Sequence, residues 1–302
     1  MSTSRTRLCS DGPEFSRLVM GTWRLVDEPA LNAKETLRLI EECVDLGITT
    51  FDEADIYGNY GSEEVFGKAL NLNPSLKHKI EVVTKCGIKL ISDKRLAHKV
   101  KHYDTTKEHI IASVENSLKV MDLDHIDLLL IHRPDPLMNP DEIAEAFMLL
   151  NEGGKVFHFG VSNFTVRQFE LLQSRMSLPL VTNQVEASLL YRELMLDGTI
   201  DYLFQHKISP MAWSPFGGGA LFSKDSQYQD LHQVLAELSQ KYDGAGYDQL
   251  ALAWLYYHPA NLIPILGTKK IERIKAAAAA EEIKLSREEW FKLWSAAGGQ
   301  IP

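Results

Sequence analysis

Several polar side chains stand directly after short apolar runs of this sequence, at the point where each run ends. Asp52, Lys85 and His132 each follow such a run, and Tyr57 lies in the segment just after Asp52. A carboxyl, an ammonium, an imidazole and a phenol are groups that enzymes use as general acids and bases. Packing in the protein core does not readily explain polar residues at the ends of so many successive apolar runs, because such residues are rarely buried unless they are paired. The pattern therefore indicates acid–base chemistry at a shared site.

The apolar runs are short and continuous, which is typical of strands buried on both faces of a parallel sheet. The predicted strands are Ile48–Phe51, Ile80–Thr84, Ile126–Ile131, Phe157–Val161, Leu180–Thr182, Ile208–Ala212 and Ile263–Leu266. An earlier run, Arg17–Met20, is either a further strand or a cap beneath the sheet. Stretches with helical periodicity lie between the runs. The predicted helices are Ala33–Leu46, Lys107–Met121, Asp141–Asn151, Val166–Ser174, Leu231–Lys241 and Gln249–Tyr257, and the alanine run Ala276–Ala280 also favours helix.

Regular alternation of strands and helices implies βαβ units with right-handed crossovers. A doubly wound sheet of the dinucleotide-binding type is expected to carry Gly-x-Gly-x-x-Gly after an early strand, and the sequence has no such match. The chain has 302 residues, and a (β/α)₈ barrel needs about 250. We therefore predict that residues 1–302 form a single α/β domain, a (β/α)₈ barrel. Catalytic residues of such barrels lie at the carboxyl ends of the strands.

Composition narrows the functional classes. The chain is 45% hydrophobic and 24% charged, with a formal net charge of -9, and this acidity disfavours binding to nucleic acid. No apolar run of about 18 residues is present, and the amino terminus lacks an apolar signal core, so a cytoplasmic protein without a membrane span is expected. Three cysteines without a Cys-x-x-Cys pair predict neither a disulfide framework nor structural zinc. His98 and His102 are spaced i, i+4 but lack an evident third ligand, so no metal site is expected.

A series of motifs resembles the aldo-keto reductase family over nearly the whole chain. Gly47–Gly58 with Gly61–Gly67 resembles the signature around that family's catalytic Asp and Tyr, and Glu53 departs from it where Ser or Thr is usual. The further matching segments are Val83–Cys86, Asp127–His132, Gly154-Lys155, Gly160–Phe164, Asn183-Gln184, Trp213–Gly217 and Ile263–Arg273. Each motif is weak alone, whereas their order and spacing together are specific.

The resemblance implies a catalytic tetrad of Asp52, Tyr57, Lys85 and His132. Reduction of a carbonyl moves hydride to carbon and requires a proton for the oxygen. A free tyrosine, with a pKa of about 10, is too weak an acid near neutrality, and a nearby ammonium such as Lys85 lowers that pKa. Asp52 would hold Lys85 charged, and His132 would orient the substrate oxygen by a hydrogen bond.

The resemblance also implies a nicotinamide cofactor, NADPH or NADP, and a small carbonyl substrate. Ser162, Asn163 and Gln184 would hold the carboxamide, Trp213 would stack on the ring, and Lys269 with Arg273 would bind the phosphate that distinguishes NADPH from NADH. The remaining cofactor candidates are Gly21, Thr22, Trp23, Ser214, Pro215, Gly217, Gly267 and Thr268. The substrate candidates are Trp23, Tyr57 and His132. The segment Lys89–Lys107 is expected on the same face, as a solvated loop or as part of the substrate mouth.

Two alternatives remain open at this point. A protein with the same fold and site could bind NADP(H) as a sensor or accessory subunit, with slow turnover or none. A different barrel enzyme could use Lys85 to form a Schiff base, as some lyases do, but Tyr57 and the Lys269/Arg273 pair would then have no assigned role.

Overall fold

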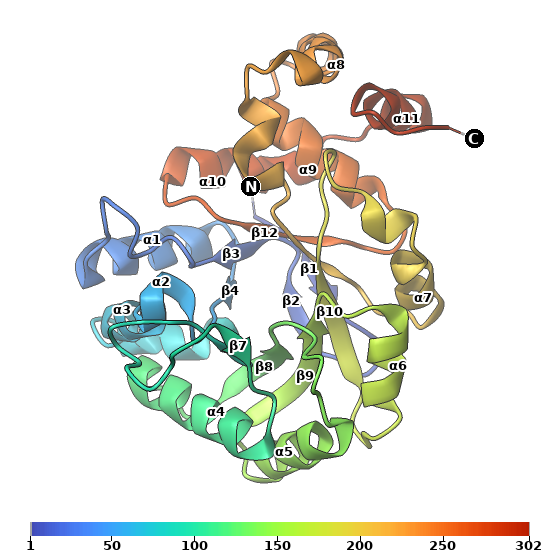
Figure 1. The fold of residues 1–302 in the computed structure, drawn as a ribbon. Coiled ribbons are helices and arrows are strands. Elements are labelled where there is room, and N and C mark those ends of the chain that lie inside the picture. Colours follow the sequence, from blue (N-terminus) through green and yellow to red (C-terminus); the bar gives the residue numbers. More distant parts are fainter. Residues whose placement is uncertain (1, 302) are drawn as a thin grey trace.

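Parallel strands close into a barrel in the computed structural model, which describes residues 2–301. The barrel order in these residues is β10-β11-β12-β3-β4-β5-β8-β9, and β9 pairs with β10 to complete the closure. The strands are β3 (Val19–Gly21), β4 (Thr50–Asp52), β5 (Glu81–Cys86), β8 (Ile126–Ile131), β9 (Val156–Ser162), β10 (Leu180–Glu186), β11 (Met211–Trp213) and β12 (Ile263–Leu266). The predicted (β/α)₈ barrel is thereby confirmed, and Figure 1 shows its strands surrounded by helices.

The surrounding helices follow the predicted periodicity closely. They are α1 (Ala33–Asp45), α3 (Ser62–Leu70), α4 (Lys107–Met121), α5 (Pro140–Glu152), α6 (Val166–Gln173), α7 (Thr199–Gln205), α8 (Gln229–Lys241), α9 (Tyr247–Tyr257), α10 (Ile271–Ala278) and α11 (Arg287–Ala296). The six helices predicted by range agree within two residues at either end. The alanine run closes α10 and then tightens into a 3₁₀ turn, Ala279–Glu282.

Four helices were not predicted. The shortest is α2 (Tyr57–Tyr60), which follows β4 and begins with Tyr57. Helix α7 has seven residues and begins after Gly198, which caps it without a side-chain hydrogen bond. Helix α3 likewise begins without a side-chain cap, at Gly61. Helix α11 did carry a start signal, because Ser286 and Glu289 form a capping box.

A hairpin closes the barrel at the end where the strands begin, and its side chains pack inside the barrel. Strands β1 (Arg5–Arg7) and β2 (Glu14–Ser16) form an antiparallel hairpin that the sequence analysis did not predict. Leu8 and Phe15 from this hairpin are fully buried among the inward-facing strand residues, such as Val83 and Leu128. The segment Arg17–Met20 is therefore not the cap. It leads into β3, which pairs with β12 and β4 as a true barrel strand.

Polar residues extend β10 beyond its predicted end at Thr182. Asn183 pairs with Val161, and Gln184 pairs with Ser162 on one side and Met211 on the other. The tertiary ladder overrides the weak strand propensity of these amides. None of the helices in residues 2–301 is both long and apolar enough to cross a membrane.

Gly67 marks the closest approach of two outer helices. An ideal Cβ at this position would lie 2.4 Å from the Val120 carbonyl oxygen and 2.5 Å from the Met121 Cα, both at the end of α4. We expect Gly67→Ala to lower the free energy of unfolding by about 1–3 kcal/mol, because overpacking forces the backbones of α3 and α4 apart. Urea denaturation measures this change. Lys68→Ala, on the exposed side of the same helix, is the control and is expected within about 0.5 kcal/mol of the parent. Equal stability of the two variants would contradict the role of Gly67.

Candidate active site

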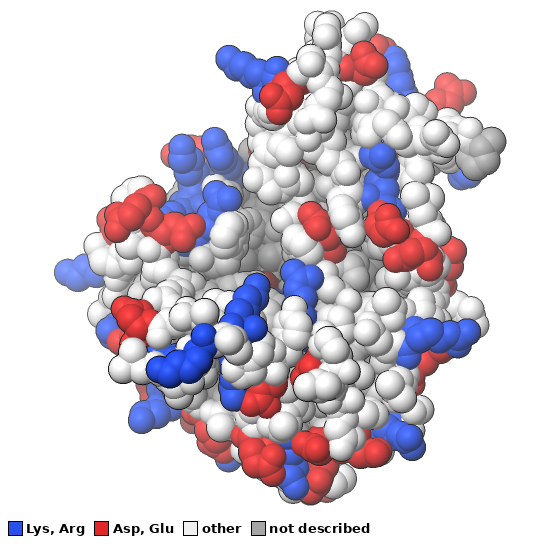
Figure 2. Space-filling model, in the orientation of Figure 1, with Lys and Arg blue, Asp and Glu red and all other residues white. Residues whose placement is uncertain are grey.

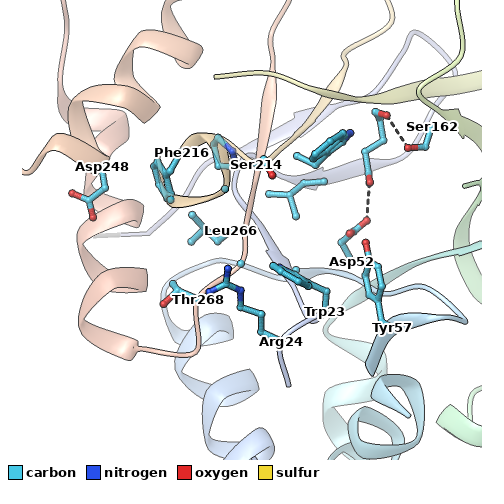
Figure 3. A pocket seen from close by; sticks show the side chains of 18 of the residues that line it. Trp23, Arg24, Asp52, Tyr57, Ser162, Ser214, Phe216, Asp248, Leu266 and Thr268 are labelled. Carbon is cyan, nitrogen blue, oxygen red and sulfur yellow. Dashed lines mark hydrogen bonds between the residues drawn. The ribbon is translucent and has the colours of Figure 1, made fainter. Parts of the chain in front are cut away.

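A cavity of about 540 Å³ opens at the carboxyl ends of the barrel strands. Figure 3 shows residues of this cavity converging from separate elements, with Asp52 and Tyr57 at one end, Asp248 at the other and Trp23 and Arg24 between them. All strands of the barrel run in parallel, so residues that follow them in the sequence meet on one face. The strand-end residues of the sequence analysis are accordingly brought together here.

Lys85 is a fully buried cation at the centre of this end. Its Nζ donates to Asp52 Oδ2 at 2.7 Å, to the Glu53 carbonyl oxygen at 2.7 Å and to Tyr57 Oη at 3.1 Å. Gln184 Nε2 donates to the other oxygen of Asp52, also at 2.7 Å. Asp52 and Tyr57 line the cavity and Lys85 lies behind them, so the ammonium acts on the cavity through these two side chains.

The pKa values of this group define its protonation. Burial alone would lower the pKa of Lys85, but Asp52 and Tyr57 outweigh burial and raise it above its ordinary value, so Lys85 is charged. Burial also raises the pKa of Tyr57, and the opposing effect of Lys85 does not overcome it. The expectation of a lowered tyrosine pKa is thus wrong, because desolvation of the phenolate exceeds the attraction of the ammonium. Tyr57 is protonated at neutral pH.

His132 faces Tyr57 across the cavity. The two rings are edge to face with centroids 5.8 Å apart. Burial, followed by the charges of Lys85 and Arg133, lowers the pKa of His132 well below its usual range. Its Nδ1 is buried without a hydrogen-bond partner in the described residues. His132 is therefore a neutral imidazole, able to hydrogen-bond an oxygen without carrying charge into the cavity.

A hydrogen-bonded chain of amide, hydroxyl and indole groups forms the neighbouring wall. Trp213 Nε1 donates to Asn163 Oδ1 at 3.0 Å, Asn163 Nδ2 donates to Ser162 Oγ at 2.7 Å, and Ser162 Oγ donates to the Gln184 carbonyl oxygen at 2.9 Å. Asn163 has a left-handed backbone, with φ of 58°. This chain fixes the side chains that would meet a flat polar ring.

Most of the remaining candidates line the same cavity. These are Gly21, Trp23, Ser214, Pro215, Gly267, Thr268 and Arg273. The absence of a side chain at Gly267 leaves room for Trp23, because a Cβ atom at position 267 would lie only 2.8 Å from Trp23 Nε1.

Besides Lys85, three candidates lie outside the cavity lining. Thr22 is buried, and its hydroxyl donates to the Asp52 carbonyl oxygen at 3.0 Å. Gly217 is replaced in the lining by Gly218 and Gly219. Lys269 Nζ donates to the carbonyl oxygens of Asp27 and Pro29 at 2.8 and 2.7 Å. Lys269 therefore ties the segment after Trp23 to the segment after β12.

Other lining residues escaped the sequence analysis. They are Arg24, Arg133, Phe216, Phe222, Asp248, Ile265 and Leu266. Arg24 and Arg133 each directly follow a predicted site residue, Trp23 and His132, so extending each run of candidates by one residue would have found both. Asp248 comes from α9, far away in the sequence from its neighbours in the cavity, and no local signal marks it.

A second group of acids is buried behind Lys85. Neither carboxyl oxygen of Glu53 forms a hydrogen bond of normal length and geometry within residues 2–301, although the nearby hydroxyls of Thr22 and Ser62 offset part of the rise in its pKa. Burial and then the charge of Glu63 raise the pKa of Glu53 to about 8 and that of Asp55 to about 8. Glu63 accepts from Thr84 at 2.7 Å and from Ser117 at 3.0 Å. The departure from the family pattern at Glu53 thus places a carboxylic acid that stays largely neutral around pH 7 next to the charged lysine.

The model of the aldo/keto reductase family matches residues 17–297 of this chain. The chain therefore belongs to the aldo-keto reductase family and is an oxidoreductase of that family.

Two bacterial relatives are similar over almost their whole length. The chain is 49% identical to the oxidoreductase YdhF of Escherichia coli (strain K12), covering 98% of each protein. It is 47% identical to a 6-dehydroglucose reductase of Agrobacterium fabrum, covering 96% of this chain and 97% of the relative. Among solved structures, a thermostable aldo-keto reductase, Tm1743, in complex with the inhibitor epalrestat superposes with a TM-score of 0.80 at 27% identity, over 97% of this chain and 99% of that one.

The raised pKa of Glu53 leads to a pH-dependent stability. Between its ordinary pKa of 4.5 and about 8, the unfolded chain ionises Glu53 while the folded chain keeps it neutral, so stability falls as pH rises through this window and levels off above it. We expect Glu53→Gln to lose less thermal stability than the parent between pH 5 and pH 8, measured by scanning calorimetry. Asp55 keeps its own titration in both proteins. Glu64→Gln, on an exposed part of α3, should leave the parent's pH dependence unchanged, and identical pH profiles for Glu53→Gln and the parent would rule out a neutral Glu53.

Proposed function

We propose that this protein, acting as one barrel domain, reduces an aldehyde or ketone to the alcohol with NADPH. The observation that carries the proposal is the contact of a protonated Tyr57 with the charged, fully buried Lys85 at a cavity wall. A reduced nicotinamide held in this cavity would supply the hydride that the carbonyl carbon needs. Tyr57 donates its phenolic proton to the carbonyl oxygen, and the ammonium of Lys85 stabilises the phenolate that remains.

The other members of the group position and balance this proton transfer. Asp52 compensates the charge of Lys85, and Gln184 holds the second oxygen of Asp52. His132, as a neutral donor, orients the carbonyl oxygen toward Tyr57. The proposed acid is therefore Tyr57, assisted by Lys85, Asp52 and His132.

The residues along the cavity suit the proposed cofactor. Ser162, Asn163 and Gln184 offer the donors and acceptors that a carboxamide needs, and the Trp213 ring beside them offers a stacking surface. Gly218 and Gly219 line the cavity with positive φ angles of 65° and 103° and no atoms where a Cβ would stand, which permits a close approach of the backbone to a phosphate. Arg273 lines the far end and carries the charge that a further phosphate requires.

Neither alternative of the sequence analysis is favoured by these contacts. A lysine that forms a Schiff base attacks as the neutral amine and must reach the substrate. Lys85 is charged, is held by three hydrogen bonds and lies behind the cavity wall. A protein that only binds NADP(H) has no need for the buried Lys85–Asp52 pair beside Tyr57, since that pair is costly to bury.

The names of two relatives point to the kind of carbonyl to test first. The Agrobacterium fabrum relative and a second relative, from Novosphingobium aromaticivorans and 32% identical over 97% of this chain, are both 6-dehydroglucose reductases. We therefore propose a sugar-derived aldehyde as the first substrate class to assay with this protein.

The proposed acid is tested by its removal. Tyr57→Phe is expected to lower kcat for carbonyl reduction by at least about 100-fold, the usual contribution of a general acid, while NADPH still binds. Steady-state absorbance of NADPH measures the first quantity and fluorescence titration the second. Tyr60→Phe is the matched control, because Tyr60 lies outside the cavity and its hydroxyl accepts a hydrogen bond from the Leu90 amide. Turnover of Tyr57→Phe near that of the control would remove Tyr57 from the mechanism.

The choice between NADPH and NADH is tested at the far end of the cavity. We expect the parent to bind NADPH more tightly than NADH, and Arg273→Ala to raise the NADPH dissociation constant about 10-fold or more while NADH binding stays nearly constant, because one charge-assisted contact is lost. Lys269→Ala is expected to change both dissociation constants by a similar factor, since Lys269 holds the loop carbonyls of Asp27 and Pro29. Fluorescence titration with each cofactor measures all four values. Equal affinities of the parent for NADPH and NADH would disprove the assignment.

A further inference from the structure

Two cations in the cavity wall, Arg24 and Arg133, have no assigned role, and Arg133 is the one that adjoins the reacting end of the cavity at His132. Arg133 directly follows His132 in the loop after β8, and both residues line the cavity. The guanidinium carbon lies 5.2 Å from the centroid of the Trp213 ring. Among residues 2–301, Arg133 forms neither a hydrogen bond nor an ion pair, within 3.5 and 4.0 Å respectively. The ring face therefore holds the plane of the guanidinium while its N–H groups remain available.

The surroundings of Arg133 explain why this availability matters. Glu186, at the end of β10, is close enough to feel the charge: burial raises the pKa of Glu186 and Arg133 partly offsets that rise. The Glu186 carboxylate is nevertheless too far from the Arg133 guanidinium to form an ion pair. Arg133 is half-buried, so its donors are partly withdrawn from water without being satisfied by a carboxylate of the protein. Such a group gains most from a ligand that brings acceptor oxygens.

The charge of the cavity supports the same conclusion. Although the whole chain carries a net charge of -9, three arginines line this cavity, and of its two aspartates Asp52 is neutralised by Lys85. Figure 2 shows a hollow near the centre of this face, with Lys and Arg side chains below it and Asp or Glu side chains to its right. A basic site on an acidic protein favours ligands with negative charge or oxygen acceptors over apolar ones.

We propose that Arg133 determines substrate specificity by binding acceptor oxygens of the substrate close to its reacting carbonyl. The substrate is accordingly an oxygen-rich carbonyl compound, with either a carboxylate or neighbouring hydroxyls on the side of the carbonyl that faces Arg133. The planar fork of the guanidinium can engage two such oxygens at once. This inference rests on the proposed carbonyl reduction and specifies its substrate class.

The test compares three aldehydes of similar size in the parent and in Arg133→Met. Succinic semialdehyde carries a carboxylate, glyceraldehyde carries hydroxyls, and butanal carries neither. We expect Arg133→Met to raise KM about 10-fold or more for whichever oxygen-rich aldehyde the parent prefers, while kcat and KM for butanal and the NADPH dissociation constant stay within about twofold. The larger change identifies carboxylate or hydroxyl as the recognised group. Arg133→Lys should restore part of the loss for the carboxylate, because it keeps the charge without the fork.

Arg95→Met is the matched control. Arg95 lies over the Tyr60 ring, with its guanidinium carbon 4.7 Å from the centroid. Neither Arg95 nor any other residue of the segment Lys89–Lys107 is among the residues that line the cavity. The same substitution there removes a similar cation–aromatic contact, and the kinetics with all three aldehydes should be unchanged.

The outcomes separate this proposal from the proposed function. Equal losses for butanal and the oxygen-rich aldehydes, or weakened NADPH binding in Arg133→Met, would show that Arg133 only supports Trp213 and the cofactor pocket, while carbonyl reduction would still stand. If no aldehyde is reduced, the proposed function fails, and calorimetric binding of succinate and of glycerol to the NADP complex decides the role of Arg133. Loss of that binding in Arg133→Met supports the proposal. The proposal is overturned if the parent binds neither compound, or if Arg133→Met binds them as tightly as the parent does.

Discussion

The buried ion pair of Lys85 and Asp52 is the interaction on which the site depends. A fully buried ammonium is costly to desolvate and is tolerated only when charges and hydrogen bonds compensate it. Here the compensation comes from three groups around Nζ and from Gln184 on the far side of Asp52. Because these groups belong to β4, β5 and β10 and to the loop after β4, the pair constrains strands on opposite sides of the barrel.

The same pair determines the protonation of its neighbours. Lys85 holds positive charge next to Tyr57 and contributes to keeping His132 neutral. Burial lowers the pKa of His132 but raises the pKa of the acids behind Lys85, so Glu53 and Asp55 have pKa values of about 8. One charged pair surrounded by neutral acids, a neutral imidazole and a protonated phenol concentrates the electrostatic effect of the site on the phenolic oxygen.

Charge is distributed unevenly along the cavity. The middle is lined by amide, hydroxyl and aromatic groups that are already hydrogen-bonded to one another, so they present a rigid and nearly neutral wall. The arginines stand toward its ends, Arg133 beside His132 and Arg273 near Thr268. Under the proposed function, this separation would let one end bind a phosphate and the other select a substrate without a large charge at the reacting carbonyl.

The sequence by itself determined the strands and most helices, because apolar periodicity reflects which residues a parallel sheet and its covering helices bury. It also determined that Asp52, Lys85, His132 and Gln184 lie on one face, since parallel strands end at the same edge. Local patterns contained no comparable information about α7, which is short and weakly capped, or about Asp248.

Tertiary structure decided the features that depend on contacts between distant segments. Lys269 faces the carbonyls of the loop after Trp23 instead of the cavity, because that loop lies across the end of β12. Arg133 lies at the cavity because its guanidinium packs over the ring of Trp213, which belongs to another strand. The pKa of Tyr57 is raised although Lys85 adjoins it, because the effect of burial outweighs that of the neighbouring charge. The spacing of residues in the sequence suggests the neighbouring charge but does not encode the burial.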